Sequence, residues 1–211
     1  MADASPAIRK LTSQDVDAAA DVLVRAFFDY PMLQWVLPKD EHRHAALPAF
    51  LRGSVRWGLL MGEVYGGGDP LSGVAIWAPP GLRDADLDPD DSFVRYADVL
   101  TALGPEAEAR HERFITEQHA IRDSEIGART WYLAWLGIDP SAQRTGVGGA
   151  LLRHMFDRLD PEGIDTYLET EKAANVPYYE RHGFGVVTRG VISGGGPNFW
   201  TMRRVAGSSI H

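Results

Sequence analysis

The chain has 211 residues, of which 45% are hydrophobic, and this is enough for one large domain with a full core. It contains no cysteine, which excludes disulfides, thiolate zinc sites and cysteine nucleophiles. The formal net charge of −8 disfavours charge-driven binding to nucleic acid and is compatible with a cationic substrate such as an amine.

The N-terminal residues show no targeting pattern. They lack the basic start and apolar run of a secretory signal, and no apolar run in the chain approaches the roughly 20 residues of a membrane span. We therefore expect a cytoplasmic protein that is a monomer or homodimer, with no membrane or nucleic acid among its partners.

The first part of the chain predicts helices alternating with short strands. Apolar residues recur at helical spacing after Thr12 and Asp15, a pair that resembles a capping box. The predicted elements are a strand over 7–11, a helix over 13–30 that Pro31 ends, a helix over 38–61 that Gly62 ends, a hairpin with arms at 63–65 and 71–77 around a turn at 66–70, an acidic linker over 84–91, and a helix over 92–122 broken at Gly104-Pro105.

The most informative stretch begins at Trp131. The segment Trp131–Ile138 is aromatic and apolar with almost no charge, as expected of a buried central strand. A glycine-rich loop over 143–149 follows, and then a helix that ends at Leu159. Glycines at a loop-to-helix junction let a pyrophosphate approach backbone N–H groups, and the helix dipole favours its negative charge.

This loop fits neither of two common nucleotide motifs. The third glycine of a dinucleotide fingerprint would fall at Leu151, and no Gly-Lys-Ser/Thr follows at the spacing of a P-loop. What remains is a pyrophosphate-sized anion held by backbone amides at a helix start, where Arg144 can add a charge-assisted contact.

The rest of the chain continues the alternation of strands and helices. Its predicted elements are a strand over 165–170, a helix over 175–182 with Gly183 as a left-handed cap and Phe184 packing back, and closing strands over 185–192 and 198–205 joined by a turn at 194–197. With no internal repeat and no clear boundary, the pattern predicts a single domain over 1–211 with frayed ends at 1–6 and 206–211.

Two motifs together resemble those of the GNAT acetyltransferase superfamily. The run Gln143-Arg144-Thr145-Gly146-Val147-Gly148 resembles its Q/R-x-x-G-x-G/A acyl-CoA motif. Asn175 and the run from Tyr179 to Phe184 look like its Asn and Tyr-x-x-x-Gly-Phe segment, in the family's order.

Within the superfamily the chain looks most like the puromycin N-acetyltransferase branch. The segments that carry this likeness are 26–31, 75–77, 131–134, 137–140, 168–170, 177–181 and 200–202. The pairs Arg144-Thr145 and Glu171-Lys172 depart from that enzyme, as does the segment after Trp77, so the substrate is expected to differ.

The resemblance implies an α/β (α+β) GNAT fold, with a mixed central sheet of about seven strands flanked by helices and a splay between the fourth and fifth strands. It implies direct transfer of an acetyl group from acetyl-CoA, the cosubstrate, to the amine of a small molecule. Expected contacts with acetyl-CoA are Leu136, Gly137, Ile138, Arg144, Thr145, Gly146, Val147, Gly148, Gly149, Ala150, Asn175 and Tyr179. Gly137 interrupts a strong strand, which indicates a bulge or a close backbone approach, and Asn175 is expected to cap its helix as well.

Tyr179 occupies the position of the family's general acid, and a phenol can protonate the departing CoA sulfur at neutral pH. Its alternative role is only to orient the thioester. The segment Trp131–Ile138 contains no acid, so Glu169 on the next strand is the best candidate base, acting directly or through water, with Asp29 second. A base is unnecessary if the free amine arrives unprotonated.

The acceptor is expected to lie among aromatic side chains and an acid, drawn from Asp29, Tyr30, Trp77, Tyr132 and Trp135. Strand alternation places Trp131 and Leu133 opposite Tyr132 and Ala134, so not all of the aromatic residues can share one pocket. No metal site is expected, since the histidines lack metal-ligand spacing. A peptide N-acetyltransferase and a non-catalytic acyl-CoA-binding module remain as alternatives.

Overall fold

The computed structural model describes residues 6–81 and 104–209. In chain order its elements are β1 (Ile8–Lys10), α1 (Val16–Phe27), α2 (Pro31–Val36), α3 (Asp40–Met61), β2 (Glu63–Gly67), β3 (Gly73–Ala78), α5 (Pro105–Glu125), β4 (Trp131–Ile138), α6 (Val147–Leu159), β5 (Thr166–Thr170), α7 (Val176–Glu180), β6 (Gly185–Val191) and β7 (Asn198–Arg204). Short 3-10 turns occur at Ser13–Asp15, Pro140–Ala142, Asp160–Glu162 and Ala173–Asn175. The predicted linker over 84–91 and the first part of the predicted helix over 92–122 lie outside the described residues.

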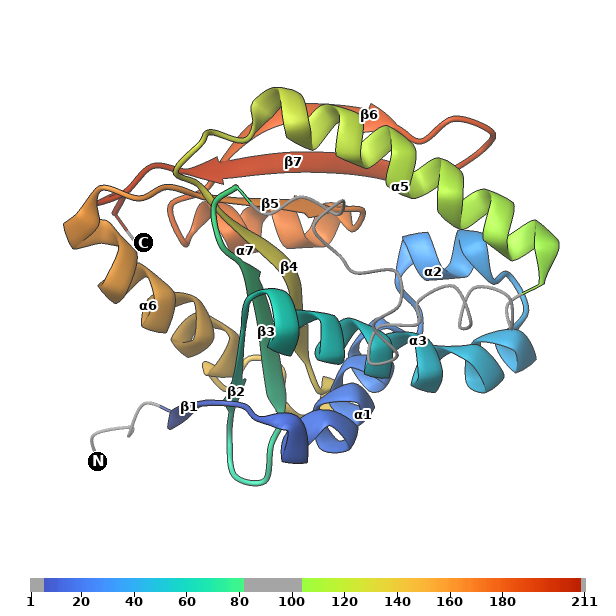
Figure 1. Cartoon of the computed structure of the whole chain (residues 1–211), viewed down its shortest axis with the longest axis horizontal. Coiled ribbons are helices and arrows are strands. Elements are labelled where there is room, and N and C mark those ends of the chain that lie inside the picture. The colour runs from blue at the N-terminus through green and yellow to red at the C-terminus, as the bar shows by residue number, and fades with distance from the viewer. Residues whose placement is uncertain (1–5, 82–103, 210–211) are drawn as a thin grey trace.

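Seven strands form one mixed sheet in the order β1-β2-β3-β4-β5-β7-β6 (Figure 1). All neighbouring pairs are antiparallel except β4 and β5, which run parallel. The parallel pairing covers only Trp131 to Leu133, opposite Thr166 to Leu168. Because β4 continues to Ile138, the two strands separate beyond this point, and the predicted splay is confirmed.

Helices cover both faces of the sheet (Figure 1). The sheet separates the core into two clusters of buried side chains. On the face of α1 and α3, Leu23, Leu47 and Ile76 are fully buried. On the face of α6, Leu151 and Leu168 are buried in the second cluster. Burying a side chain of this size stabilises the fold by roughly 1.5–3 kcal/mol. The central strands are therefore held from both sides and form a rigid support for a site.

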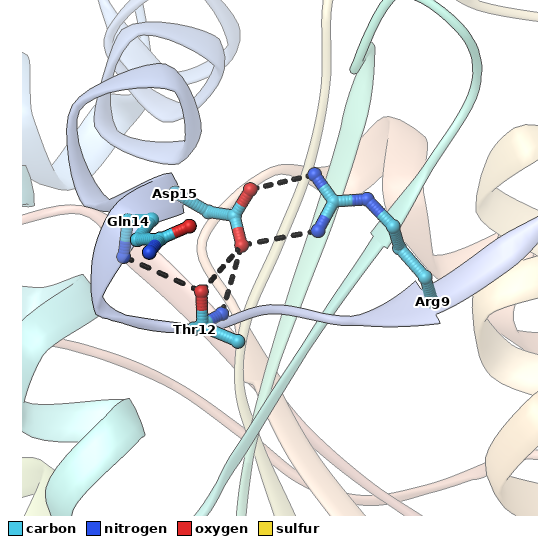
Figure 2. A network of polar contacts seen from close by, with 4 residues as sticks. All are labelled: Arg9, Thr12, Gln14 and Asp15. Carbon is cyan, nitrogen blue, oxygen red and sulfur yellow. Dashed lines mark hydrogen bonds and ion pairs between the residues drawn. The ribbon is translucent and has the colours of Figure 1, made fainter.

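The predicted capping box at the start of the first helical segment is confirmed (Figure 2). The Thr12 hydroxyl accepts from the Gln14 amide at 3.3 Å, and the Asp15 carboxylate accepts from the Thr12 amide at 2.9 Å. Arg9 donates hydrogen bonds from Nη2 and Nη1 to the same carboxylate, at 2.6 and 3.0 Å. The hydrogen bonds from Arg9 and from the Thr12 amide hold the pKa of Asp15 well below its usual range. The turn thus ties β1 to α1.

Pro31 has a different role from the predicted one. The first long helix ends at Phe27, and Pro31 begins a further short helix, α2, that the sequence did not predict. Proline is tolerated at the first helical position because its missing N–H would have no intrahelical partner. The residue before it, Tyr30, is extended, with φ −75° and ψ 135°. This corner directs Tyr30 toward the end of β5.

Candidate active site

The loop between β4 and α6 reverses the chain with left-handed backbone at two positions. Gly146, the residue before the helix, has φ 89°, and Arg144 has φ 67°, which is uncommon for a side chain with a Cβ. Asp139 anchors the start of the loop, because its carboxylate accepts from the Ser141 amide at 2.9 Å and from Arg25 Nε at 2.6 Å. The loop is therefore tied to α1 as well as to β4.

The first turn of α6 lies against both β4 and α7. Helix N-termini leave backbone N–H groups without intrahelical partners, which favours an anion at this place. A Cβ on Gly148 would lie 2.6 Å from the Tyr178 hydroxyl and 3.4 Å from Ile138 Cγ1. A Cβ on Gly149 would lie 3.1 Å from His182 Nε2. The glycines that the sequence assigned to an acetyl-CoA cradle thus occupy positions where only glycine fits without rearrangement.

Tyr178 of α7 and His182, which follows this helix, lie beside this turn and were not selected from the sequence. The Tyr178 hydroxyl is buried and, within the part of the chain that the structure describes, has no hydrogen-bond partner. Burial raises its pKa to about 12. His182 is fixed by a 2.8 Å hydrogen bond between Nδ1 and the Tyr178 carbonyl, and burial lowers its pKa. The cradle therefore has an unsatisfied phenol and a neutral imidazole at its edge.

A bulge interrupts β4 at Ala134. Ile76 of β3 pairs with Trp135, whereas the next residue, Trp77, pairs with Leu133, so Ala134 is the extra residue of the ladder. As a result Ala134 and Trp135 both pack on the cluster beneath α1 and α3.

Gly137 was predicted to mark either a bulge or a close backbone approach. The bulge lies at Ala134, and α1 approaches the strand closely at Gly137. There, a Cβ would meet Leu23 Cδ2 at 2.6 Å and Phe27 Cε2 at 2.9 Å. Glycine at this position instead allows α1 to pack closely on β4.

Tyr179 lies at the centre of the α7 packing and is only 7% exposed. Its ring meets those of Tyr178 and Phe184 edge-on, with centroids 5.3 and 5.7 Å away. Gly183, with φ 85°, ends the segment as predicted, and the Phe184 amide donates to the Tyr179 carbonyl. Burial raises the pKa of Tyr179, so the phenol stays protonated at neutral pH.

Glu169 lies on β5 beside the splay. One carboxylate oxygen, Oε2, accepts from the Tyr132 hydroxyl at 2.7 Å. The other, Oε1, is buried and has no partner among the described residues. Burial raises the pKa of Glu169 to about 7, against the opposing effect of the Tyr132 hydrogen bond. A carboxyl group with this pKa can exchange protons near neutral pH.

Glu171 is a second buried carboxyl group that the sequence analysis did not nominate. It is 8% exposed, and its Oε1 accepts from Gln118 Nε2 of α5 at 2.7 Å. Burial raises its pKa to about 7. The sequence signal that could have identified Glu171 is its position two residues after Glu169, because alternate residues of a strand face the same side.

The end of β5 is joined by hydroxyl and amide contacts to the residues that directly precede α2 and α7. The Tyr30 hydroxyl lies 3.0 Å from Thr170 Oγ1 and accepts from the Glu171 amide at 3.0 Å. Asn175 donates its side-chain amide to Thr170 Oγ1 at 3.1 Å. The expected capping of α7 by Asn175 is wrong, because its side chain makes no cap hydrogen bond and is used here instead.

Three of the expected substrate residues form no hydrogen bond or ring contact with Glu169, Glu171 or Tyr179 among the described residues. Asp29 is exposed and lies 3.5 Å from Gln34 Nε2. Trp77 is fully buried in the core of the sheet. Trp135 packs edge-on against Phe27, with ring centroids 4.9 Å apart. The structure therefore brings together a smaller set, whose members are Tyr30, Tyr132, Glu169, Glu171 and Tyr179.

Three further observations concern the described ranges 6–81 and 104–209. They contain no group of three or more His, Asp or Glu side chains that could hold a metal ion. No helix in them is both long and apolar enough to cross a bilayer. A pocket of about 360 Å³ lined by residues of β1 and the end of α3 shares no residue with the site above.

Comparison with known proteins gives a consistent assignment. Residues 110–184 match the sequence model of the Acetyltransferase (GNAT) family. An uncharacterized N-acetyltransferase of Schizosaccharomyces pombe is 27% identical over 187 residues, covering 84% of this chain and 74% of that protein. The [ribosomal protein bS18]-alanine N-acetyltransferase of Escherichia coli is 41% identical over 56 residues, covering 25% of this chain and 38% of that protein.

The fold also matches a solved structure over nearly its whole length. The crystal structure of a histone acetyltransferase HPA2-related acetyltransferase from Corynebacterium glutamicum superposes with a TM-score of 0.67 at 23% identity, covering 98% of each chain. With the parallel β4–β5 pair, the splay and the glycine-rich start of α6, the chain has the GNAT fold, and its residues 110–184 are similar to the GNAT family of acetyltransferases.

Proposed function

We propose that this enzyme transfers the acetyl group of acetyl-CoA to the amine of a small molecule, with Tyr179 as general acid and Glu169 as general base. The observation that supports the proposal is that Glu169 lies just beyond the β4–β5 pairing and that Tyr179 is within electrostatic range of Glu171, two residues further along. Glu169 lies on β5 where the pairing with β4 ends, and Tyr179 lies on α7, whose neighbouring Tyr178 contacts the α6 cradle.

The described residues fit acetyl-CoA along β4 and α6. The start of α6 offers backbone N–H groups to the pyrophosphate through Gly146, Val147, Gly148, Gly149 and Ala150, with Arg144 and Thr145 beside them. Beyond Leu133, no strand among the described residues pairs with the β5 side of β4, which leaves backbone groups of Leu136, Gly137 and Ile138 for the pantetheine arm. Asn175, bonded to Thr170, lies near that arm in this proposal.

The side chains then move two protons. Glu169 accepts one from the ammonium group of the acceptor, and the freed nitrogen lone pair attacks the thioester carbonyl carbon. A C–N bond forms and the C–S bond breaks, while Tyr179 donates its proton to the leaving sulfur. The nitrogen loses its second proton, which restores the Tyr179 phenol, so the products are the acetamide, CoA thiol and one proton on Glu169.

A small acceptor fits the burial of this site. Tyr179 and Glu171 are 7% and 8% exposed, so the reacting end is reached by a slender group more easily than by the surface of a folded protein. We further propose that the chain belongs near the puromycin N-acetyltransferase branch, on the strength of the segments 131–134 and 177–181. Glu171, where the chain departs from that enzyme, is expected to change the acceptor.

The test is release of free CoA thiol from acetyl-CoA in the presence of aminonucleosides, polyamines, aminoglycosides, simple amines and peptides. We expect turnover with at least one small amine and little with peptides. Turnover with peptides alone would favour a peptide N-acetyltransferase. Binding of acetyl-CoA without thiol release for any acceptor would point to a non-catalytic binding module and contradict the proposal.

A further inference from the structure

Glu171 lies at the centre of the tyrosines around the splay. It follows the last residue of β5, beyond the point where β4 and β5 are paired. Its negative charge contributes to the raised pKa values of Tyr30, Tyr132 and Tyr179, which places it within electrostatic range of all three. A charge at Glu171 is therefore felt by the proposed acid and by both tyrosines that bond to β5 residues.

Glu171 differs from the buried arginines of the described residues in that it has no partner of opposite charge among those residues. Among the described residues, buried arginines have carboxylate partners: Arg43 is 3% exposed and pairs with Asp40, and Arg204 is 1% exposed and pairs with Asp160 at 2.6 Å. Glu171 is also buried, at 8% exposed, yet no Lys or Arg in the described ranges forms an ion pair with it. A buried carboxylate without a counter-ion is costly unless a ligand supplies the positive charge.

A purely structural role does not require the charge. The contact with Gln118 fastens α5 to the end of β5, and a glutamine at position 171 would accept the same hydrogen bond through its amide oxygen. The backbone N–H that reaches Tyr30 is independent of the side chain. What a glutamate adds to these contacts is a negative charge, held in place by Gln118 within electrostatic range of Tyr30 and Tyr179.

On the basis of the proposed function, we propose that Glu171 binds the ammonium group of the acceptor and so restricts the enzyme to amines that are positively charged at neutral pH. Gln118 positions this carboxylate. Glu169 then takes the proton, so the two carboxyl groups have separate tasks, recognition and deprotonation. This assignment names the substrate class as alkyl amines and excludes neutral aryl amines.

The test compares Glu171→Gln with wild type, using the isomers benzylamine and p-toluidine as competitors of the best acceptor in the thiol-release assay. Benzylamine is mostly protonated at about pH 7 and p-toluidine is mostly neutral. In the variant, the benzylamine concentration needed to compete should rise about tenfold or more, because a charge-assisted contact is lost. The p-toluidine concentration needed to compete should change by less than about twofold. The KM of the best acceptor should rise in parallel, while the affinity for acetyl-CoA is unchanged.

Two variants serve as controls. Glu171→Asp keeps the charge on a shorter side chain and should recover part of the discrimination, whereas Glu180→Gln, on the exposed side of α7, should behave as wild type. Equal effects of Glu171→Gln on both competitors, or no effect on either, would overturn the inference while leaving the proposed function intact. Absence of transfer to every amine tested would overturn the proposed function, and this inference with it.

Discussion

Tyr179 keeps its proton at neutral pH because burial among Tyr178 and Phe184 raises its pKa. If it protonates the CoA sulfur, removing its hydroxyl acts on the chemical step and not on binding. Tyr179→Phe should therefore lower kcat by about 100-fold or more, within the usual range for a general acid, and leave the affinity for acetyl-CoA unchanged. Steady-state kinetics and calorimetric titration measure the two quantities.

The matched control for this prediction is Tyr65→Phe. Tyr65 is a β2 tyrosine whose hydroxyl donates to Glu63 at 3.1 Å, outside the site. Its loss should leave kcat near the wild-type value. A Tyr179→Phe enzyme with unchanged kcat would remove the acid role, and one with weakened acetyl-CoA binding alone would assign Tyr179 to orienting the thioester.

Glu169 makes a separate prediction about stability. Burial raises its pKa from the ordinary 4.5 to about 7, so the folded state binds this proton more tightly than the unfolded chain does. The resulting stabilisation is present below about pH 4.5 and is lost as the pH rises through about 7. Glutamine carries no charge to bury. Glu169→Gln should therefore exceed wild type in free energy of unfolding by roughly 1–3 kcal/mol at about pH 8, and by much less at about pH 5.

Urea unfolding at the two pH values tests this difference. The same variant should have lost most of its activity, since the proposed base is gone. The Glu169 carboxyl group would then lower stability while being required for activity. Glu180→Gln, which alters an exposed carboxyl, should show no such pH-dependent gain. A Glu169→Gln protein that is less stable than wild type at the higher pH would show that the carboxylate is paired favourably in the folded state.

At the scale of elements, the start of α6 is where helix, strand and α7 meet. A methyl group on Gly148 would lie 2.6 Å from the Tyr178 hydroxyl and would cover the backbone N–H groups offered to the pyrophosphate. Gly148→Ala should therefore weaken acetyl-CoA binding about tenfold or more and lower stability by roughly 1–3 kcal/mol. Calorimetric titration and thermal unfolding measure the two effects.

The double variant Gly148→Ala/Tyr178→Phe separates the two causes. Removing the hydroxyl makes room for the methyl group, so stability should recover. Binding should stay weak if the methyl group blocks the anion itself. Recovery of both would mean that the cradle was disturbed only through Tyr178, and the proposed contact of the pyrophosphate with the first turn of α6 would then be contradicted.

The elements around this junction differ in how well the sequence predicted them. The strand Trp131–Ile138 and the helix ending at Leu159 were predicted almost to the residue, because uniform apolarity and helical spacing are local signals. The bulge at Ala134 was not, since the surrounding residues are apolar on both faces and give no alternation to interrupt. The short helix α2 was missed because its proline was taken as the end of the preceding helix.

At the scale of the whole molecule, the site depends on contacts between distant parts of the chain. Gln118 and Glu171 are 53 positions apart, and Tyr30 and Thr170 are 140 apart. No local pattern encodes such pairs, so motifs nominated Tyr179 and the cradle, whereas the only sequence signal for Glu171 was its spacing from Glu169. A motif contains only the residues of one segment, whereas the acceptor side is assembled by packing from the residue before α2, from α5 and from the end of β5.

Because the proposed cradle draws on β4, α6 and α7 together, acetyl-CoA should stabilise the whole fold. A ligand that binds only the folded state adds about 2.7 kcal/mol at a concentration 100 times its Kd. For a domain of this size, such a gain corresponds to a rise in Tm of roughly 5–10 °C. Scanning calorimetry with acetyl-CoA should show this rise, and Gly148→Ala should reduce it at the same ligand concentration. An unchanged Tm at saturating acetyl-CoA would contradict the cradle assigned to α6, since binding there without stabilisation is thermodynamically inconsistent.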